Sequence, residues 1–285
     1  MNDDTIFIVG ANGQLGTALR TQYPGSQFAD IDELDITDPD SVESFDWSGI
    51  KIVLNAAAYT NVDGAETAKG RVAAWKVNAT AVSYLAKACL EHDMTLVHIS
   101  SDYVFDGTQD PHTELEPLSP LSVYGESKAA GDLLVGLLPR HYILRTTWVI
   151  GEGKNFVRTM LGLAQKSISP TVVADQIGRL TFTEELVRAI DHLLVSKSDF
   201  GTYNVTNDGQ PMSWADITRK IFELSGYDSL TVSDIPTAEY YSDKDGIAPR
   251  PLMSTMCLDK LQATGFESRD WKDNLNSYIQ KEYQK

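Results

Sequence analysis

Short apolar runs recur along the chain and predict buried strands. Residues 5–9, 51–55 and 95–99 are rich in β-branched and other apolar side chains, as expected for strands that are covered on both faces. Residues 26–31 and 202–206 are similarly short and are expected to form two further strands. Longer amphipathic segments separate these runs, so the chain is predicted to be an α/β protein.

Apolar residues that recur along one side predict the helices. Residues 17–23 follow the first strand, and residues 71–91 form the longest predicted helix. The apolar side of this longer helix consists of Val72, Trp75, Val77, Val82, Leu85, Ala86 and Leu90. A third helix is expected to begin after Ser213, a predicted N-cap, and to end at Gly226. Its apolar residues are interpreted as core.

A glycine-rich turn joins the first strand to the first helix. Gly10, Gly13 and Gly16 stand directly after the strand with the spacing Gly-x-x-Gly-x-x-Gly. A strand, a glycine turn and a helix together direct backbone N–H groups and a helix N-terminus at a pyrophosphate. The turn therefore predicts a dinucleotide site, although the same glycines could form a tight turn that binds nothing.

Acidic and very small residues follow the next two strands. Asp30 lies twenty residues after Gly10, where a carboxylate can accept hydrogen bonds from the adenosine ribose, and Asp32 competes for this role. Asp35 opens a second acidic turn. Residues 56–58 are all alanine, and such small side chains let a ring or a ribose approach the backbone. Close helix packing is the alternative explanation for them.

Tyr124 and Lys128 stand four residues apart, so they share one face if the segment is helical. An ammonium beside a phenol favours the phenolate, so Lys128 is expected to lower the pKa of Tyr124 from about 10. A tyrosine of this kind can donate a proton to a carbonyl oxygen or take one from a hydroxyl. The pattern alone is weak, because Tyr240 and Lys244 repeat it in a stretch typical of a solvated surface.

Composition narrows the classes of function. The 285 residues carry a formal net charge of −16, which argues against a nucleic-acid partner because phosphate binding needs clustered Lys and Arg. No apolar run approaches the roughly 20 residues of a membrane helix. The acidic N-terminus leads directly into a strand and is not typical of a secretory signal. The two cysteines suggest neither a disulfide framework nor a metal site, and a cytoplasmic location is expected.

The order of these features resembles the short-chain dehydrogenase/reductase superfamily: a glycine turn after the first strand, Ser101 after a later strand, then Tyr124 and Lys128. Longer stretches resemble more specifically the dTDP-4-dehydrorhamnose reductase family, an extended branch of that superfamily. They cover nearly the whole chain and comprise residues 13–16, 56–63, 101–107, 124–128, 145–149, 155–156, 175–178 and 250–251.

The resemblance implies a Rossmann-type doubly wound parallel sheet in residues 1–150, with a returning segment near residues 171–196. A smaller, mostly C-terminal α/β substrate domain is expected in residues 151–285. The catalytic residues implied are Ser101, Tyr124 and Lys128. The cofactor-binding residues implied are Gly10, Asn12, Gly13, Gln14, Leu15, Asp30, Asp35, Ile36, Ala56, Ala57, Ala58, Tyr59, Asn78, Tyr124 and Lys128. The substrate-binding residues implied are Ser101, Asp102, Tyr103, Trp148, Asn155 and Arg250, with no metal.

The resemblance also implies a reaction, in which NADPH or NADH reduces the C4 keto group of dTDP-4-dehydro-β-L-rhamnose. Nothing basic lies between Gly10 and Gly16, and Asp30 would repel a 2′-phosphate, which leaves the cofactor preference open although the family commonly accepts NADPH. Two residues depart from the family pattern: Ser101 replaces a threonine and Leu180 replaces a proline. A homodimer is one expected assembly, and fusion or association with the preceding epimerase is another.

Two other classes of protein share much of this pattern. Nucleotide-sugar epimerases and 4,6-dehydratases keep the tyrosine and lysine but consume no cofactor, and the dehydratases resemble one another in a Thr-Asp-Glu stretch. Here Tyr103 follows Asp102, so the second carboxyl group is missing. A non-catalytic, cofactor-binding regulatory subunit is the other alternative; the retention of Ser101, Tyr124 and Lys128 together argues against it.

Overall fold

A six-stranded parallel sheet forms the centre of the protein, whose computed structural model describes residues 2–283. The strands lie in the order β10-β5-β4-β3-β1-β2, and every neighbouring pair is parallel. Their bounds are β1 Ile6–Val9, β2 Gln27–Ala29, β3 Ile52–Asn55, β4 Thr95–Ser101, β5 His141–Thr146 and β10 Gly201–Asn204. The predicted α/β fold class is confirmed, and all five predicted strands are present.

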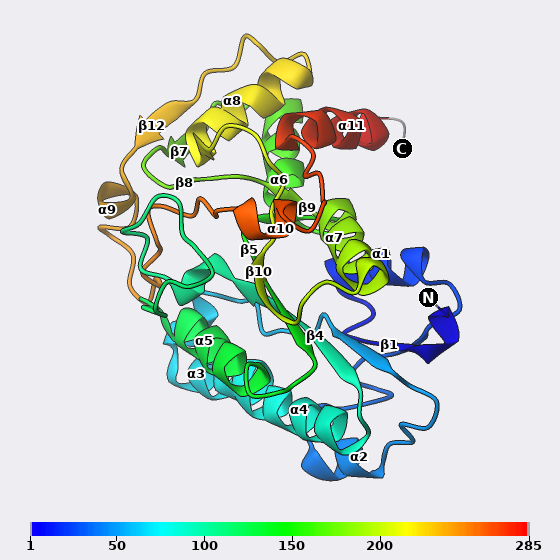
Figure 1. Ribbon diagram of the computed structural model, residues 1–285. Helices are drawn as coiled ribbons and strands as arrows, with labels where there is room; N and C mark the ends of the chain where they lie inside the picture. The colour runs from blue at the N-terminus through cyan, green and yellow to red at the C-terminus, as the bar shows by residue number, and fades with distance from the viewer. Residues whose placement is uncertain (1, 284–285) are drawn as a thin grey trace.

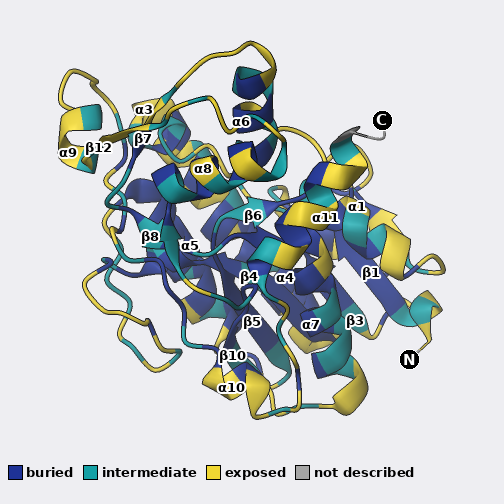
Figure 2. Cartoon of the chain, turned by 90° about the horizontal axis from the view of Figure 1, so that it is seen from above, coloured by how far each residue is buried: buried dark blue, intermediate teal, exposed yellow. Residues whose placement is uncertain are grey.

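Helices cover both faces of this sheet (Figure 1). On one face α1 (Gln14–Gln22) packs against α7 (Thr183–Ser196), and their leucines and isoleucines meet Ile6, Ile8 and Leu54 of the sheet. On the other face lie α2 (Pro39–Ser44), α4 (Ala81–Glu91) and α5 (Val123–Val135), with α3 (Ala68–Trp75) beside α5. Figure 2 shows the strands in dark blue, enclosed by helices whose outer surfaces are yellow.

A smaller set of helices and strands lies at one end of the molecule (Figure 1). Its core includes Trp271, Leu275 and Phe222, all almost fully buried. Ser213 caps α8 by accepting the backbone N–H of Asp216, as predicted. The elements are β6 Val149–Ile150, α6 Phe156–Gln165, β7 Thr171–Val173, β8 Ile177–Gly178, β9 Thr181–Phe182, β11 Met212–Ser213, α8 Trp214–Leu224, β12 Ser233–Ile235, α9 Thr237–Tyr240 and α11 Trp271–Tyr283. The short helix α10 (Asp259–Gln262) packs instead beside β10, and its Leu261 joins the core between the sheet, α1 and α7.

The longest predicted helix is interrupted by a π-helical turn. Residues 71–91 comprise most of α3, the π-turn Lys76–Thr80 and then α4. Such a turn adds a residue to the helical repeat and rotates the segments on its two sides relative to each other. Val82, Leu85 and Ala86 are buried, whereas Val72 and Trp75 before the turn are exposed. Leu90 is also exposed because Cys89 takes the core position beside it, so the predicted apolar side was wrong for these three residues.

The strand order creates a switch point beside β1. From β1 the chain passes first to β2 on one side and then to β3 on the other. Loops at the carboxyl ends of β1 and β3 therefore leave in opposite directions and form a crevice, which is where open α/β sheets bind ligands. The glycine turn and residues 56–58 both lie there.

Candidate active site

The glycine turn is closely packed against the loop that follows β3. Gly10 has a φ of +74°, and a Cβ on it would lie 2.6 Å from the backbone nitrogen of Ala57. A Cβ on Gly16 would lie 2.1 Å from the carbonyl oxygen of Gly10. The next element, α1, begins after Gly13 and has no side chain that caps its first turn. Its N–H groups are therefore directed out of the turn, as phosphate binding requires.

A cavity of about 320 Å³ lies beside this turn, at the switch point of the sheet. Asp30 and Asp35 stand on one wall, and the alanines of residues 56–58 stand on the other. Hydrogen bonds from Thr37 lower the pKa of Asp35, so its carboxylate is held ionised. The structure thus brings together, around one cavity, the predicted residues Gly10, Gly13, Asp30, Asp35, Ile36, Ala56, Ala57 and Ala58.

Other predicted cofactor residues support the loops around this cavity. The buried Asn78 accepts the N–H of Tyr59 at 2.8 Å and donates to its carbonyl oxygen at 3.1 Å, so it fixes the loop after β3. Leu15 points into the core between α1 and the sheet. Gln14 accepts the N–H of Gly151 at 2.9 Å and ties the glycine turn to the loop after β6.

Ser101 and Tyr124 meet at the carboxyl end of β4. Ser101 ends that strand, while Ser122 caps α5 and places Tyr124 in its first turn. The Tyr124 phenol lies close enough to the Ser101 hydroxyl for that hydroxyl to affect its pKa, and both residues are at least nine-tenths buried. Burial raises the pKa of Tyr124 to about 12; the Ser101 hydroxyl lowers it less than burial raises it, and Asp102 and Asp132 raise it further.

Lys128 lies one turn further along α5 and is completely buried. Its Nζ donates to the carbonyl oxygen of Ile99 at 2.6 Å and lies 3.5 Å from Nε2 of His98. Burial lowers the pKa of Lys128 to about 8, although Asp132 opposes the shift. The prediction that Lys128 lowers the pKa of Tyr124 is therefore wrong for this arrangement. The ammonium is engaged with β4, and desolvation dominates the pKa of the phenol.

His98 lies beside Lys128 and is itself contacted by Asn55, and the sequence did not single out either residue. The N–H of Ala57 donates to Oδ1 of Asn55, which leaves Nδ2 of Asn55 facing Nδ1 of His98 at 3.2 Å. The two ring nitrogens of His98 thus face Nδ2 of Asn55 on one side and Nζ of Lys128 on the other. Complete burial and the nearby ammonium hold the pKa of His98 well below its usual value. A histidine inside an apolar strand run was the available signal.

Asp102 is buried between two serine hydroxyls. Ser101 donates to its Oδ1 at 2.9 Å, and Ser254 donates to its Oδ2 at 2.6 Å. Burial raises the pKa of Asp102 to about 6, against the opposing effect of both hydrogen bonds. Both carboxylate oxygens are thus engaged by protein groups. Ser254, from the C-terminal part of the chain, is a further residue that the sequence did not indicate.

Tyr103 and Arg250 lie near Tyr124. The Tyr103 ring meets the Tyr124 ring edge to face, with centroids 5.4 Å apart. Nη2 of Arg250 contacts both carboxylate oxygens of Asp63, at 2.8 and 2.9 Å, and its guanidinium lies over the ring of Tyr241. Arg250 and Tyr103 are close enough for their charges to affect each other's pKa. The structure therefore groups Tyr103, Tyr124 and Arg250.

Trp148 lies after β5, with a φ of +46° in the left-handed region that bulky residues rarely adopt. Its indole stacks on that of Trp214 at 3.8 Å between centroids. A Cβ on Gly178 would lie 3.0 Å from this indole, so only a very small residue fits there. Stacking and the glycine together hold Trp148 in a conformation that its backbone alone disfavours.

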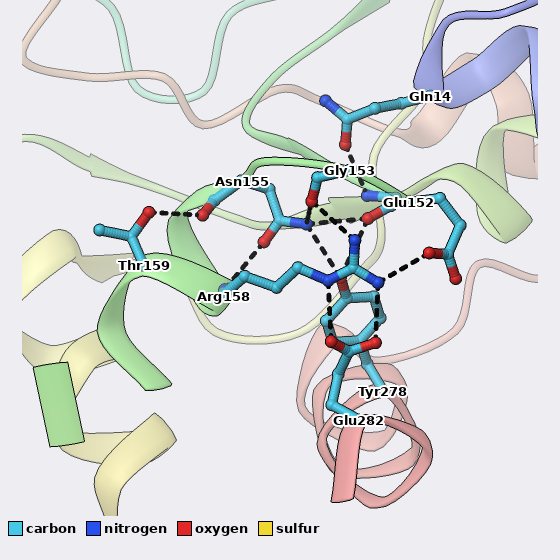
Figure 3. A network of polar contacts seen from close by, with 9 residues as sticks. Gln14, Glu152, Gly153, Asn155, Arg158, Thr159, Tyr278 and Glu282 are labelled. Carbon is cyan, nitrogen blue, oxygen red and sulfur yellow. Dashed lines mark hydrogen bonds and ion pairs between the residues drawn. The ribbon is translucent and has the colours of Figure 1, made fainter. Parts of the chain in front are cut away.

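Asn155 lies in a separate polar network (Figure 3). Its Oδ1 caps α6 at the N–H of Arg158, and its Nδ2 donates to the carbonyl oxygen of Gly151 and to the Tyr278 hydroxyl. Arg158 in turn contacts Glu152 and Glu282. Asn155 thus supports the joint between α6 and α11. A larger cavity of about 640 Å³ borders this network between α1, α7 and α11, but none of the predicted catalytic residues lines it.

Comparison with known proteins identifies the family. The family model described as the RmlD substrate binding domain matches residues 4–284. A dTDP-4-dehydrorhamnose reductase of Aggregatibacter actinomycetemcomitans is 38% identical over 299 residues, covering 96% of this chain and 99% of the relative. The chain belongs to the dTDP-4-dehydrorhamnose reductase family. The resemblance drawn from the sequence is confirmed.

Two solved reductases of this family have the same fold along nearly their whole length. The one from Clostridium acetobutylicum is 37% identical with a TM-score of 0.88, covering 96% of this chain and 98% of that chain. The one from Bacillus anthracis, solved in complex with NADP, is 34% identical with a TM-score of 0.88, covering 97% and 98%.

The described residues contain no helix long and apolar enough to span a membrane. Within residues 2–283 there is also no cluster of His, Cys, Asp or Glu arranged to hold a metal ion.

Proposed function

We propose that the protein reduces the C4 keto group of dTDP-4-dehydro-β-L-rhamnose with NAD(P)H and forms dTDP-L-rhamnose. The observation that carries this proposal is the buried Ser101–Tyr124 pair, with Lys128 one turn away, at the carboxyl end of β4. A crevice with an uncapped helix N-terminus lies at the same edge of the sheet. Bound NAD(P)H supplies the hydride, and the protein must supply the proton.

Tyr124 is the proton donor in this proposal. A phenol whose pKa is raised to about 12 stays protonated at neutral pH, so the acid is in its reactive form before the reaction begins. As hydride reaches C4, its oxygen becomes an alkoxide, which is a stronger base than a phenolate and takes the proton from Tyr124. Lys128, whose ammonium is engaged with β4, is proposed to hold the nicotinamide ribose and does not act by lowering the pKa of the phenol.

Asp102 decides in which direction the Ser101 hydroxyl points. A serine has one proton, and in the structure Ser101 gives it to Asp102 while accepting the N–H of Tyr103. Ser101 therefore cannot donate to the substrate oxygen while Asp102 is ionised. Protonation of Asp102 reverses this bond, because the acid then donates to Ser101 and frees the serine proton for the C4 oxygen. Asp102 is in this way a positioning residue, not a direct contact of the sugar.

Asp102→Asn tests this role through a pH profile. In the wild type, kcat/KM for reduction should rise as the pH falls through about 6, where Asp102 becomes protonated. The variant should lose this inflection and should have, at every pH, the higher kcat/KM that the wild type reaches below pH 6, because the amide nitrogen of asparagine donates to Ser101 at every pH. Ser254→Ala should move the inflection to higher pH, since the Ser254 bond lowers the pKa of Asp102. An inflection that is unchanged in Asp102→Asn would contradict the role.

Tyr103 and Trp148 are proposed to form the walls of the sugar site, and Arg250 to contact the diphosphate. Tyr103 already packs on Tyr124, which places its ring beside the reacting group. Arg250 lies between two prolines in a rigid segment. In this proposal its guanidinium gives up part of its contact with Asp63 when the diphosphate binds. Asn155 is proposed to act only by fixing the loop after β6.

The two alternative classes fit less well. A 4,6-dehydratase needs a second carboxyl group beside Asp102, and Tyr103 occupies that position. A regulatory subunit needs no proton donor, yet the phenol, hydroxyl and amine all lie together in the buried site. Consumption of NADPH or NADH, followed by absorbance with the keto-sugar nucleotide, separates the classes: a reductase consumes the cofactor and the other two do not.

The remaining proposals concern organisation. We place the cofactor domain in residues 1–150, to which the later helix α7 is added, and the mostly C-terminal substrate domain in residues 151–285. We also propose that the enzyme acts in the cytoplasm. A homodimer is supported by exposed apolar side chains on α3, α4 and α5 and just after α5, namely Val72, Trp75, Leu90, Leu133 and Leu137. Association with the preceding epimerase is the second assembly. Light scattering of the pure chain and of its mixture with the epimerase distinguishes the two.

A further inference from the structure

Arg20, on α1, is one of three arginines, with Arg71 and Arg269, that form no ion pair among the described residues. The ion-paired arginines are Arg140, Arg145, Arg158, Arg179, Arg188, Arg219 and Arg250. The Arg20 guanidinium lies instead 4.0 Å above the centre of the Phe28 ring. Its Nη1 donates to Oδ1 of Asn12 at 3.4 Å. A positive charge is thus held in place without an acidic group to neutralise it.

These two contacts place the guanidinium beside the ribose end of the dinucleotide crevice. Asn12 belongs to the glycine turn, and its N–H donates to Oδ2 of Asp30 at 2.9 Å. Phe28 lies in β2, which ends one residue before Asp30. Asp30 lines the cavity and is positioned for the adenosine ribose hydroxyls. Arg20 therefore borders the position of the 2′-substituent.

The Asp30 carboxylate does not exclude a phosphate from this position. Its Oδ2 accepts the N–H of Asn12, and its Oδ1 accepts the N–H of Ile31 at 2.9 Å. Two backbone donors thus offset part of its charge, and Arg20 adds a full positive charge nearby. The sequence argument considered only residues between Gly10 and Gly16. Arg20 was therefore missed, because it lies in α1, beyond the turn, and only its long side chain reaches Asn12 in the turn.

We propose that Arg20 forms a subsite for the adenosine 2′-phosphate and gives the protein a preference for NADPH over NADH. A guanidinium matches a phosphate with parallel N–H donors, and an arginine near the ribose is how related folds accept the phosphorylated cofactor. The subsite rests on the proposed function, because it requires a nicotinamide dinucleotide in the crevice. It adds to that function the choice between the two cofactors.

Calorimetric titration of the intact protein with NADP⁺ and NAD⁺ tests the subsite, because the two ligands differ only in the 2′-phosphate. The wild type should bind NADP⁺ more tightly. Arg20→Ala should lose about 10- to 100-fold in NADP⁺ affinity, the worth of a charge-assisted contact, and change NAD⁺ affinity by less than about twofold. Lys51→Ala is the charge-matched control, because Lys51 is exposed at the amino end of the sheet and should leave both affinities unchanged.

Three results would overturn the subsite. One is an equal change in NADP⁺ and NAD⁺ affinity in Arg20→Ala, which would indicate a general effect on the turn. Another is a selective loss of NADP⁺ affinity in Lys76→Ala but not in Arg20→Ala, since Lys76 is the cation that acts on Asp35. The third is a wild type that binds neither dinucleotide. This result would overturn the proposed function as well as the subsite, whereas the first two results would overturn the subsite alone.

Discussion

Replacing Tyr124 with phenylalanine should lower the rate of keto-sugar reduction by about 10²–10⁴-fold, the usual contribution of a general acid. Phenylalanine keeps the ring that packs against Tyr103, so the fold and the crevice should survive. Cofactor affinity should change little, because a proton that is transferred only in the transition state contributes little to binding in the ground state. Steady-state kinetics and dinucleotide titration of the same preparation separate the two effects.

Tyr240→Phe is the matched control for this variant. Tyr240 and Lys244 have the same spacing as the active pair, but they lie at the surface, where Nζ of Lys244 sits 3.7 Å above the Tyr240 ring. The control should keep full activity. A Tyr124→Phe protein that reduces the keto-sugar within a factor of a few of the wild type would mean that another group is the acid.

Lys128→Met should damage both the rate and the binding of the cofactor. The variant loses the group proposed to position the nicotinamide ribose, and with it the alignment of the hydride with C4, so we expect the rate to fall by about 10²-fold or more. The loss of the same donor should weaken cofactor binding by about 10- to 100-fold. Lys244→Met, which removes the surface lysine of the repeated pattern, should change neither quantity.

The stability of Lys128→Met provides an independent readout. Burial lowers the pKa of Lys128 from 10.5 to about 8, so between these values the unfolded chain binds a proton that the folded chain does not. The free energy of unfolding of the wild type should therefore rise with pH across this window, relative to the variant. Denaturant titrations from pH 7 to 10.5 measure the difference. A difference that stays constant or falls would show that the lysine is not held in a desolvated site.

The sequence predicted the strands of the sheet and the helical spacing of Tyr124 and Lys128 because these are local properties, whereas Ser101 was grouped with them only through the resemblance to the family. It did not predict the pKa of Tyr124, which depends on how deeply a whole domain buries the phenol. Ser254 was also beyond reach, because its contact with Asp102 joins residues 152 positions apart in the chain. The contacts of His98 with Asn55 and with Lys128 depend on the register between β3, β4 and α5, which no spacing rule supplies.

Asn155 and Arg250 show a second limit of sequence reasoning. Both were predicted to bind substrate from short motifs that resemble those of the family. In the structure the hydrogen-bonding groups of Asn155 are used within its own network (Figure 3), whereas Arg250 lies near Tyr103 with its guanidinium held by Asp63. A short motif thus identifies an important residue, but it does not tell whether that residue contacts the ligand or supports the loop around the ligand site.

The most direct test of the central claim is transfer of deuterium from the cofactor to the sugar. The protein is supplied with NADPH that carries deuterium at the transferred position of the nicotinamide, together with dTDP-4-dehydro-β-L-rhamnose. Mass spectrometry and NMR then locate the label. The account predicts dTDP-L-rhamnose with one deuterium at C4 and one cofactor oxidised for each sugar formed. An unlabelled sugar, or a sugar that changes without net oxidation of the cofactor, would contradict it.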